Sequence, residues 1–194
     1  MAIVVVGPPA AGKSTVAGVL AARRGLEVAC FDEDPPRWYG RFGYTEQAAD
    51  DAYASGGLSA WHAYTARHEV RALAEAVTAT EGVVDTGGGV ALQRGGSIEE
   101  RMLRSALDRA DFAVLVCPHL EDPDQAADVL AQRLLSREQG GTPGDWHQPD
   151  GVALLQGLIR ASLALKESVD LLIDTANGEV HERHRLRPAT SEVT

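Results

Sequence analysis

A glycine-rich loop near the N-terminus constrains the fold of this chain more than any other feature. It consists of a glycine, four further residues and Gly-Lys-Ser, and reads Gly7-Pro8-Pro9-Ala10-Ala11-Gly12-Lys13-Ser14. The apolar, β-branched run at 2–6 before it is typical of a buried parallel strand. After it, a helical pattern runs from Lys13 to Arg24 and ends at Gly25. This pattern between a strand and a helix is typical of a phosphate-binding loop.

The chemistry of such a loop is specific for a nucleoside triphosphate. Its backbone N–H groups turn inward around phosphate oxygens, and the N-terminus of the helix adds partial positive charge. From a solvent-facing position in the loop, Lys13 would reach the β- and γ-phosphates, and Ser14 would coordinate Mg²⁺. We therefore expect ATP to be bound by Gly7, Ala10, Ala11, Gly12, Lys13, Ser14 and Thr15.

Strand patterns alternate with helical patterns along the rest of the chain. The expected strands are 2–6, 27–31, 82–85, 112–116 and 171–173, and the clearest later helices are 66–79, 99–109, 123–138 and 151–167. This alternation predicts an α/β fold with a five-stranded parallel sheet and helices on both faces. We expect one domain over residues 1–180, followed by a polar, disordered tail at 181–194.

Two segments interrupt this alternation. Residues 35–64 are rich in Gly and Pro and hold seven of the chain's ten aromatic residues. These rings form either a small core under a long loop or the wall of a ligand pocket. His62 and His68 in this region are expected to be structural. Residues 138–151 consist almost entirely of turn formers, so we expect them to be mobile without ligand.

Two acidic residues follow predicted strands. Asp32 comes after the second strand and Asp85 ends the third. In open parallel sheets, ligands bind at the carboxyl ends of the strands. Mg²⁺ prefers oxygen ligands and is held by one or two carboxylates together with phosphates. Ser14, Asp32 and Asp85 are therefore the candidate metal ligands.

Composition narrows the possible partners and the compartment. The net charge of −10 argues against a broad nucleic-acid surface, which needs clustered Lys and Arg. The apolar N-terminal run is too short for a signal peptide, and no apolar stretch is long enough to cross a membrane. The two cysteines, Cys30 and Cys117, each end an apolar run and are expected to be buried. A cytoplasmic protein, monomeric or homodimeric, is the expectation.

Three further motifs, together with the loop, resemble those of the shikimate kinase family. Asp32-Glu33-Asp34 follows the second strand, Asp85-Thr86-Gly87-Gly88-Gly89 follows the third, and Arg160 precedes Asp174-Thr175 at the last. The resemblance covers about 2–34 and 66–180. It implies an acceptor-binding segment at about 33–80 and a closing lid at about 133–151.

The resemblance also implies roles for single residues. Asp32 would assist Mg²⁺, and Asp34 would contact the acceptor hydroxyl. The glycine triplet, Gly87, Gly88 and Gly89, would line the acceptor pocket, and Arg160 would hold a group of the acceptor. Glycines suit such a pocket because a ligand can approach their backbone closely. A carboxylate within hydrogen-bond reach can orient and deprotonate an attacking hydroxyl.

The sequence departs from that family at two cationic positions. The family has an Arg three residues before a Glu on the acceptor helix; here the Glu is Glu69, and Ala66 takes the place of the Arg. Arg67 lies one step further around the helix, so Arg67 and Glu69 are kept as substrate candidates. The family's lid Arg is also missing before Pro149. Arg133 and Arg137, on the helix entering the lid, are the nearest substitutes.

These patterns together predict an ATP-dependent kinase that phosphorylates a hydroxyl of a small metabolite, with an acceptor other than shikimate. Alternatives that the sequence leaves open are a divergent shikimate kinase, a nucleoside or nucleotide kinase, and an ATP-binding switch without an acceptor. An acceptor pocket built from Asp34 and the glycine triplet argues against the switch, which needs none.

Overall fold

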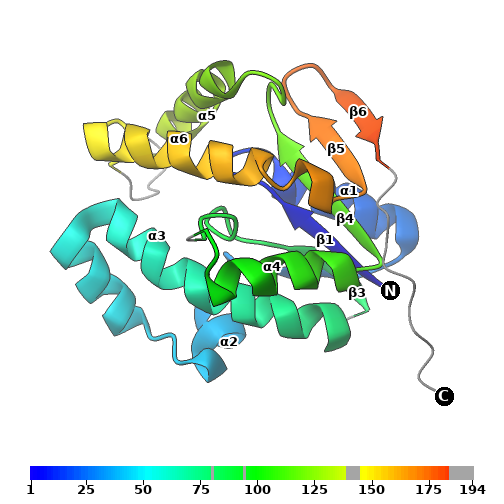
Figure 1. Ribbon diagram of the computed structural model, residues 1–194, viewed down its shortest axis with the longest axis horizontal. Helices are drawn as coiled ribbons and strands as arrows, with labels where there is room; N and C mark the ends of the chain where they lie inside the picture. The colour runs from blue at the N-terminus through cyan, green and yellow to red at the C-terminus, as the bar shows by residue number, and fades with distance from the viewer. Residues whose placement is uncertain (80, 94, 139–144, 184–194) are drawn as a thin grey trace.

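The computed structural model describes residues 1–79, 81–93, 95–138 and 145–183, and its core is one mostly parallel sheet (Figure 1). The strand order is β2-β3-β1-β4-β5-β6. The strands are β1 (Ala2–Val6), β2 (Val28–Cys30), β3 (Gly82–Asp85), β4 (Phe112–Cys117), β5 (Leu171–Asp174) and β6 (Glu179–Glu182). The first five are parallel, which confirms the α/β class. Central β1 is buried along its whole length, as a parallel strand covered on both faces must be.

The sixth strand is an addition to the expected sheet. β6 pairs antiparallel with β5, with Leu171 opposite Glu182 and Asp174 opposite Glu179. The tail was expected to begin at 181, but His181 and Glu182 belong to this strand. All four β6 residues are exposed, so the segment has no apolar alternation by which a strand could be identified. Residues 184–194 lie outside the described part of the chain.

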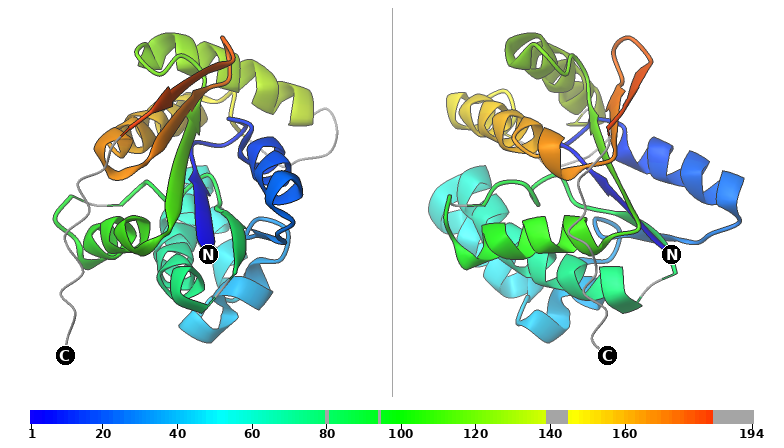
Figure 2. Two further views of the ribbon diagram at one scale, coloured as in Figure 1. Left: turned by 90° about the vertical axis from the view of Figure 1, so that its right-hand side faces the viewer. Right: turned by 45° about the vertical axis from the view of Figure 1, so that its right-hand side comes forward.

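Helices cover both faces of the sheet (Figure 2). The helix α1 (Lys13–Arg24) packs on β1, β2 and β3. On the opposite face, α3 (Glu46–Ala79) contacts β1 and β3, and α6 (Pro149–Leu163) contacts β4. The helix α4 (Ile98–Arg109) packs along α3, and α5 (Pro123–Glu138) along α6. No helix in the described segments is both long and apolar enough to cross a membrane.

The segment 35–64, in which no regular structure was expected, is largely helical. Asp34 caps α2 (Pro35–Tyr39), where the two prolines occupy the first turn, and a short 3₁₀ turn η1 (Gly40–Phe42) follows. The helix α3 then runs to Ala79 with a break at Gly56 and Gly57. Gly57 has φ 63°, a conformation that favours glycine. This break interrupts the helical pattern and explains why the first part of α3 was missed.

Most aromatic residues of this segment form a small core. Phe31 contacts Trp38 and Tyr39, with ring centroids 5.3 and 5.7 Å apart, and Tyr39 contacts Tyr44 at 5.6 Å. Tyr44 continues the chain of rings to Tyr64, also at 5.6 Å. Of the two alternatives, the small core is therefore correct for these residues. Trp61 differs, because it contacts His62.

The predicted lid is described only in part. The helix α5 ends at Glu138 and α6 begins at Pro149, after a turn that includes Trp146. Residues 139–144, at the centre of the predicted lid, lie outside the described part of the chain. A further 3₁₀ turn, η2 (Lys166–Ser168), joins α6 to β5.

Candidate active site

The glycine-rich loop has a backbone that few side chains would permit. A Cβ on Gly7 would lie 2.1 Å from the carbonyl oxygen of Val116 on β4, so only glycine fits there. Gly12 has φ 100° and caps α1 without a side chain, and Ala10 also adopts a left-handed conformation at φ 59°. A non-glycine residue held at positive φ is typical of functional loops. The loop therefore ends at the N-terminus of α1 with its amides unshielded by a capping side chain.

Lys13 was expected to face solvent, but it lies inside the site. The residue is only 6 % exposed, and its Nζ donates a hydrogen bond to the carbonyl oxygen of Pro8 at 3.3 Å. Its charge acts on Asp32, Glu69 and His62, which come from other parts of the sheet and from α3. Lys13 is thus the cation around which the polar groups of the site are arranged.

Asp85 ends β3 beside the loop with one oxygen atom unpaired. The residue is 2 % exposed; Oδ2 accepts a hydrogen bond from Cys30 Sγ at 3.5 Å, and Oδ1 has no partner among the described residues. Burial and the charge of Asp85 raise the pKa of the Cys30 thiol to about 11, so the thiol stays protonated as the donor. A buried carboxylate oxygen without a donor is a suitable ligand for a cation.

Asp32 lies opposite Lys13, at the carboxyl end of β2. The residue as a whole is exposed, yet its carboxyl group lies close against Gly87. Desolvation of this group, together with the nearby Asp85, raises the pKa of Asp32, although the charges of Lys13 and Arg137 oppose this. Asp32 and Asp85 thus share one edge of the sheet, as the sequence predicted.

Asp34 has a structural contact that the sequence did not indicate. Its Oδ1 accepts a hydrogen bond from the Arg37 amide at 3.2 Å and caps α2. The residue is exposed, and no hydrogen bond within the described chain engages its second oxygen. The cap fixes the position of Asp34 while leaving Oδ2 free to accept from a ligand.

The glycine triplet lies at the centre of the site, against three different groups. A Cβ on Gly87 would lie 2.6 Å from Asp32 Oδ1 and 2.9 Å from both carboxyl oxygens of Glu69. One on Gly88 would lie 2.6–2.9 Å from Pro9 in the loop, and one on Gly89 would lie 2.9 Å from His62 Nδ1. The glycines were expected to make room for a ligand. In the structure the missing side chains of these glycines make room for Asp32, Glu69, Pro9 and His62.

Glu69 is a buried carboxyl group of α3 that faces this triplet. It is 1 % exposed, and its Oε1 has no hydrogen-bond partner in the described part of the chain. Burial, followed by the charges of Asp32 and Asp85, raises the pKa of Glu69 well above its ordinary value; Lys13 and the Gly87 amide offset part of this. The structure thus brings Glu69 into the site, as the sequence suggested.

Two of the predicted substrate arginines lie apart from this cluster. Arg67 is exposed: its guanidinium lies over the ring of Tyr64, 4.7 Å from the centroid, and its Nε donates to His68 Nε2 at 3.2 Å. Arg160 is exposed on α6, and no hydrogen bond or ion pair within the described chain engages its guanidinium. Neither guanidinium contacts the glycine triplet or Glu69 in this arrangement.

The two arginines of α5 have different surroundings. Arg133 donates hydrogen bonds to the carbonyl oxygens of Ala10 and Ala11 at 3.3 and 3.5 Å, and to Thr175 at 3.2 Å. It therefore fixes the outside of the glycine-rich loop to the chain at the end of β5. Arg137 is exposed one turn later, and its charge acts on Asp32. Of the two α5 arginines, Arg137 is thus the one whose charge acts on Asp32.

His62 was expected to be structural, yet it reaches the site. It is 5 % exposed, its Nε2 has no partner among the described residues, and its ring lies 5.4 Å from that of Trp146, which follows the predicted lid. Burial, and then the charge of Lys13, lowers the pKa of His62 to about 4, so the ring is neutral at physiological pH. No sequence motif marks His62, because the break at Gly56–Gly57 hides the helix that positions it.

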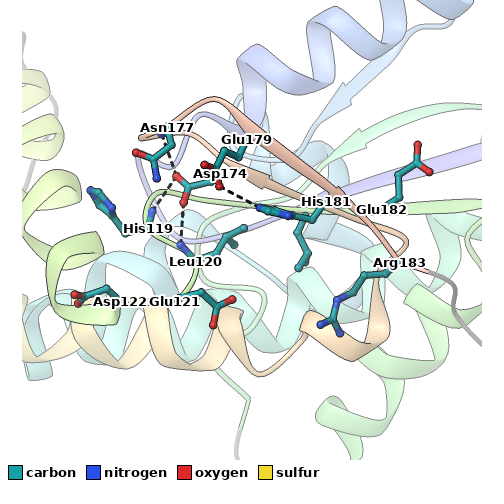
Figure 3. Close-up of a pocket in the computed structure, with 11 residues that line it drawn as sticks. His119, Leu120, Glu121, Asp122, Asp174, Asn177, Glu179, His181, Glu182 and Arg183 are labelled. Atoms are coloured by element: carbon teal, nitrogen blue, oxygen red, sulfur yellow. Dashed lines mark hydrogen bonds and ion pairs between the residues drawn. The ribbon is translucent and has the colours of Figure 1, made fainter.

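A separate cavity of about 450 Å³ lies at the β5–β6 hairpin (Figure 3). The turn after β4 and the β5–β6 hairpin line it, and no residue of the glycine-rich loop does. Its main fixed group is Asp174, whose carboxylate accepts from the amides of His119, Leu120, Ala176 and Asn177. Burial opposes the charge of Asp174, but these four donors outweigh it and lower the pKa. Asp174 therefore ties the two turns together.

The residues at the loop fit the expected ligands ATP and Mg²⁺. The unpaired Oδ1 of Asp85, the nearby carboxyl group of Asp32 and the hydroxyl of Ser14 in the first turn of α1 are the hard oxygen ligands that Mg²⁺ prefers. Within the described residues no cluster of three or more His, Cys, Asp or Glu forms a closed metal cage. Such a cage is not needed, because Mg²⁺ at nucleotide sites takes most of its ligands from phosphate and water.

Comparison with known proteins shows the fold. Three shikimate kinases share it: that from Acinetobacter baumannii, solved in complex with shikimate (23% identity, TM-score 0.54), and those from Aquifex aeolicus (20%, 0.55) and Bacteroides thetaiotaomicron (18%, 0.54). The matches cover 90% of this chain and 83%, 86% and 86% of the three chains, respectively. No protein-family model and no curated protein matches the chain. At these identities the likeness confirms the expected fold, and the chemistry must be argued from the site.

Proposed function

We propose that this protein is an ATP-dependent kinase that transfers the γ-phosphoryl group to a hydroxyl of a small molecule. One observation carries the proposal. Lys13, at the end of a phosphate-binding loop, is buried, and its charge acts on Asp32 and Glu69, the two carboxyl groups that the glycine triplet faces. A nucleotide switch would need the loop and a metal ligand. The additional buried groups around the triplet suit a second ligand.

The loop and Lys13 supply the phosphate side of the reaction. Lys13 and the loop amides would hold the β- and γ-phosphates, and Ser14, Asp32 and Asp85 would hold Mg²⁺. When bound, Mg²⁺ neutralises charge on the phosphate oxygens. Arg133 acts from outside the loop: its hydrogen bonds to Ala10 and Ala11 keep the loop in a fixed position. Such preorganised donors stabilise the transition state because they need no rearrangement during the reaction.

Asp34 is the proposed residue for the acceptor hydroxyl. The acceptor oxygen forms a bond to the γ-phosphorus while the bond to the β–γ bridging oxygen breaks, and ADP leaves with that electron pair. The hydroxyl proton passes to the Asp34 carboxylate, whose Oδ2 is free while Oδ1 caps α2. Arg137 would approach from the lid side and balance charge on the transferring group. Exclusion of water by the closing lid would favour transfer over hydrolysis.

We propose an acceptor other than shikimate for this site. Ala66 is buried where an acceptor-binding Arg would be needed, and Arg67 is turned onto Tyr64. A bidentate contact between an arginine and a carboxylate demands a fixed geometry that neither Arg67 nor the exposed Arg160 provides here. We therefore do not expect this protein to bind shikimate as the A. baumannii enzyme does in its complex.

The test is an acceptor screen that follows ADP release and phosphorylated product against hydroxy acids, polyols, amino alcohols, aminocyclitols and nucleosides. Acceptor-dependent product formation that requires Mg²⁺ would support the kinase. Slow ATP hydrolysis that no compound accelerates would favour a switch and overturn the proposal. A kcat/KM for shikimate of roughly 10⁴ M⁻¹s⁻¹ or more, with no better acceptor, would identify a divergent shikimate kinase instead.

A further inference from the structure

Glu69 has a buried polar atom that the protein itself leaves without a partner. Its Oε1 lacks a hydrogen-bond partner among the described residues, and the residue is 1 % exposed. The carboxyl oxygens and Asp32 Oδ1 lie 2.9 and 2.6 Å, respectively, from the point where a Cβ on Gly87 would be. Two carboxyl groups therefore meet at one glycine. An unpaired buried carboxyl group is costly, so a ligand that donates to it gains an interaction that water cannot replace.

The cations near Glu69 are occupied elsewhere. Ala66, one turn earlier on the same face of α3, is buried and brings no charge. Arg67 is held over Tyr64 and against His68. Lys13 donates to Pro8 and, in the proposed reaction, would bind the phosphates. Asp32 and Asp85 would be balanced by Mg²⁺, which leaves Glu69 as the acid without a positive partner.

His62 lies next to the same glycines, and two tryptophan rings pack on it. His62 Nδ1 is 2.9 Å from the Cβ position of Gly89, and His62 Nε2 is buried without a partner in the described chain. The rings of Trp61 and Trp146 lie 4.9 and 5.4 Å from that of His62. An ammonium group beside Glu69 would stabilise its ionised form and so lower its raised pKa, which a neutral group would not do. An anionic group here would add to the charges of Asp32 and Asp85, which already disfavour the ionised form of Glu69.

We infer that the acceptor carries a protonated amino group near its reacting hydroxyl, and that Glu69 receives this group at Gly87. The inference rests on the proposed kinase function and specifies its substrate class: an amino sugar, aminocyclitol or related amino alcohol. Glu69 acts as a specificity residue that contacts the substrate, while the loop and Lys13 serve any acceptor. His62 adds a second, neutral hydrogen-bonding contact.

The experiment uses acceptor series that differ at one group. One series is glucosamine, glucose and glucuronate; the other is an amino-deoxy-inositol, myo-inositol and shikimate. Phosphorylated product is measured with the full-length protein, ATP and Mg²⁺. The aminated member of at least one series should have the highest kcat/KM, by about 10- to 100-fold, as expected for a hydrogen bond to a charged group.

Matched variants test the role of Glu69. Glu69→Gln keeps the shape of the side chain and should remove the preference for the amine mainly through KM. Glu75→Gln, the same change two turns further along α3, where the side chain pairs with Arg41 at the surface, should keep it. If Glu69→Gln does not fold, the preference of the wild-type protein for the aminated acceptors alone tests the inference.

Three results would count against the inference. Equal or better turnover of the neutral or anionic members would overturn it while leaving the kinase standing. An equal loss for all three members in Glu69→Gln would show that Glu69 is structural and would overturn its assigned role. ADP release without any phosphorylated product, across both series and the wider screen, would overturn the proposed function and this inference together.

Discussion

At the scale of single residues, Lys13 has the most direct part in the proposed chemistry. Lys13→Ala should lower phosphoryl transfer by at least about a thousand-fold, because a donor aimed at the transferring phosphate is lost. Lys13 is buried among acidic groups, so its removal should also lower the melting temperature. Far-UV circular dichroism should still report a folded protein. Near-normal turnover in a folded variant would disprove the phosphate-site assignment.

Asp32 and Asp34 are two residues apart, and the structure gives them different surroundings. Asp32→Asn should weaken turnover and raise the Mg²⁺ concentration required, because Asp32 faces Lys13 and Asp85. Asp34→Asn should reduce turnover with little change in ATP affinity, since its proposed partner is the acceptor. Calorimetric titration with ATP and Mg²⁺ compares the two variants. A large loss of nucleotide affinity in Asp34→Asn alone would reverse the assignment.

His62 should make the protein less stable in mild acid. Its pKa is about 4 in the folded state and 6.5 ordinarily, so the unfolded chain binds more protons between these values. The neutral His62 ring stabilises the fold fully above pH 6.5, and this stabilisation is lost as the pH falls toward 4. The loss in the free energy of unfolding reaches about 2 kcal/mol by about pH 5.

Urea unfolding at about pH 7.5 and about pH 5 measures this difference. His62→Gln should reduce the loss between the two pH values, because glutamine does not titrate. A variant that loses as much stability as the wild type over this interval would show that His62 is not the titrating group.

At the scale of elements, the predictable and the unpredictable parts of the structure differ in how local their signals are. The strand at 2–6, the loop and α1 could be predicted, because each has a short, continuous sequence pattern that indicates a single structure. β6 could not be predicted, since its exposed residues gain their conformation by pairing with β5. The first part of α3 was missed because Gly56 and Gly57 interrupt its pattern.

The candidate site was predictable where it is built from strand ends. Asp32, Asp85 and the glycine triplet follow strands whose carboxyl ends must meet, so their proximity could be inferred. The orientation of side chains on α3 could not. Arg67 and Glu69 are two residues apart, yet one points to Tyr64 and the other to Gly87, and this depends on how the helix packs. The place of His62 in the site was missed because the break at Gly56 and Gly57 interrupts the pattern of the helix that carries it.

The contact between the glycine triplet and the loop can be tested directly. Gly88→Ala would place a Cβ 2.6–2.9 Å from Pro9, partly against its backbone, so the loop must move. We expect a loss of about 1–3 kcal/mol in stability and a weaker affinity for ATP. Gly95→Ala is the control, since a Cβ there would meet no atom within 4 Å. Unchanged ATP affinity in a folded Gly88→Ala protein would contradict the contact.

At the scale of the whole molecule, helix α3 already touches the chain that follows the predicted lid. Tyr53 donates a hydrogen bond to Asp145 Oδ2 at 2.7 Å, and His62 packs on Trp146. The amides of residues 145–151 should therefore exchange hydrogen more slowly once ATP and an acceptor are both bound. Mass spectrometry measures the hydrogen exchange of this segment in four states: without ligand, with ATP alone, with the acceptor alone and with both. Equal exchange in all four states would show that the segment does not respond to ligands.

The exposed sixth strand also affects how copies of the protein meet. A sheet that ended at β5 would offer unpaired backbone groups of an apolar strand to any neighbouring chain. β6 covers this edge and presents Glu179, His181 and Glu182 instead, all exposed. The opposite edge, β2, is only three residues long. Charge at one edge and brevity at the other discourage the strand-to-strand polymerisation that begins aggregation, so the protein should resist it even at high concentration.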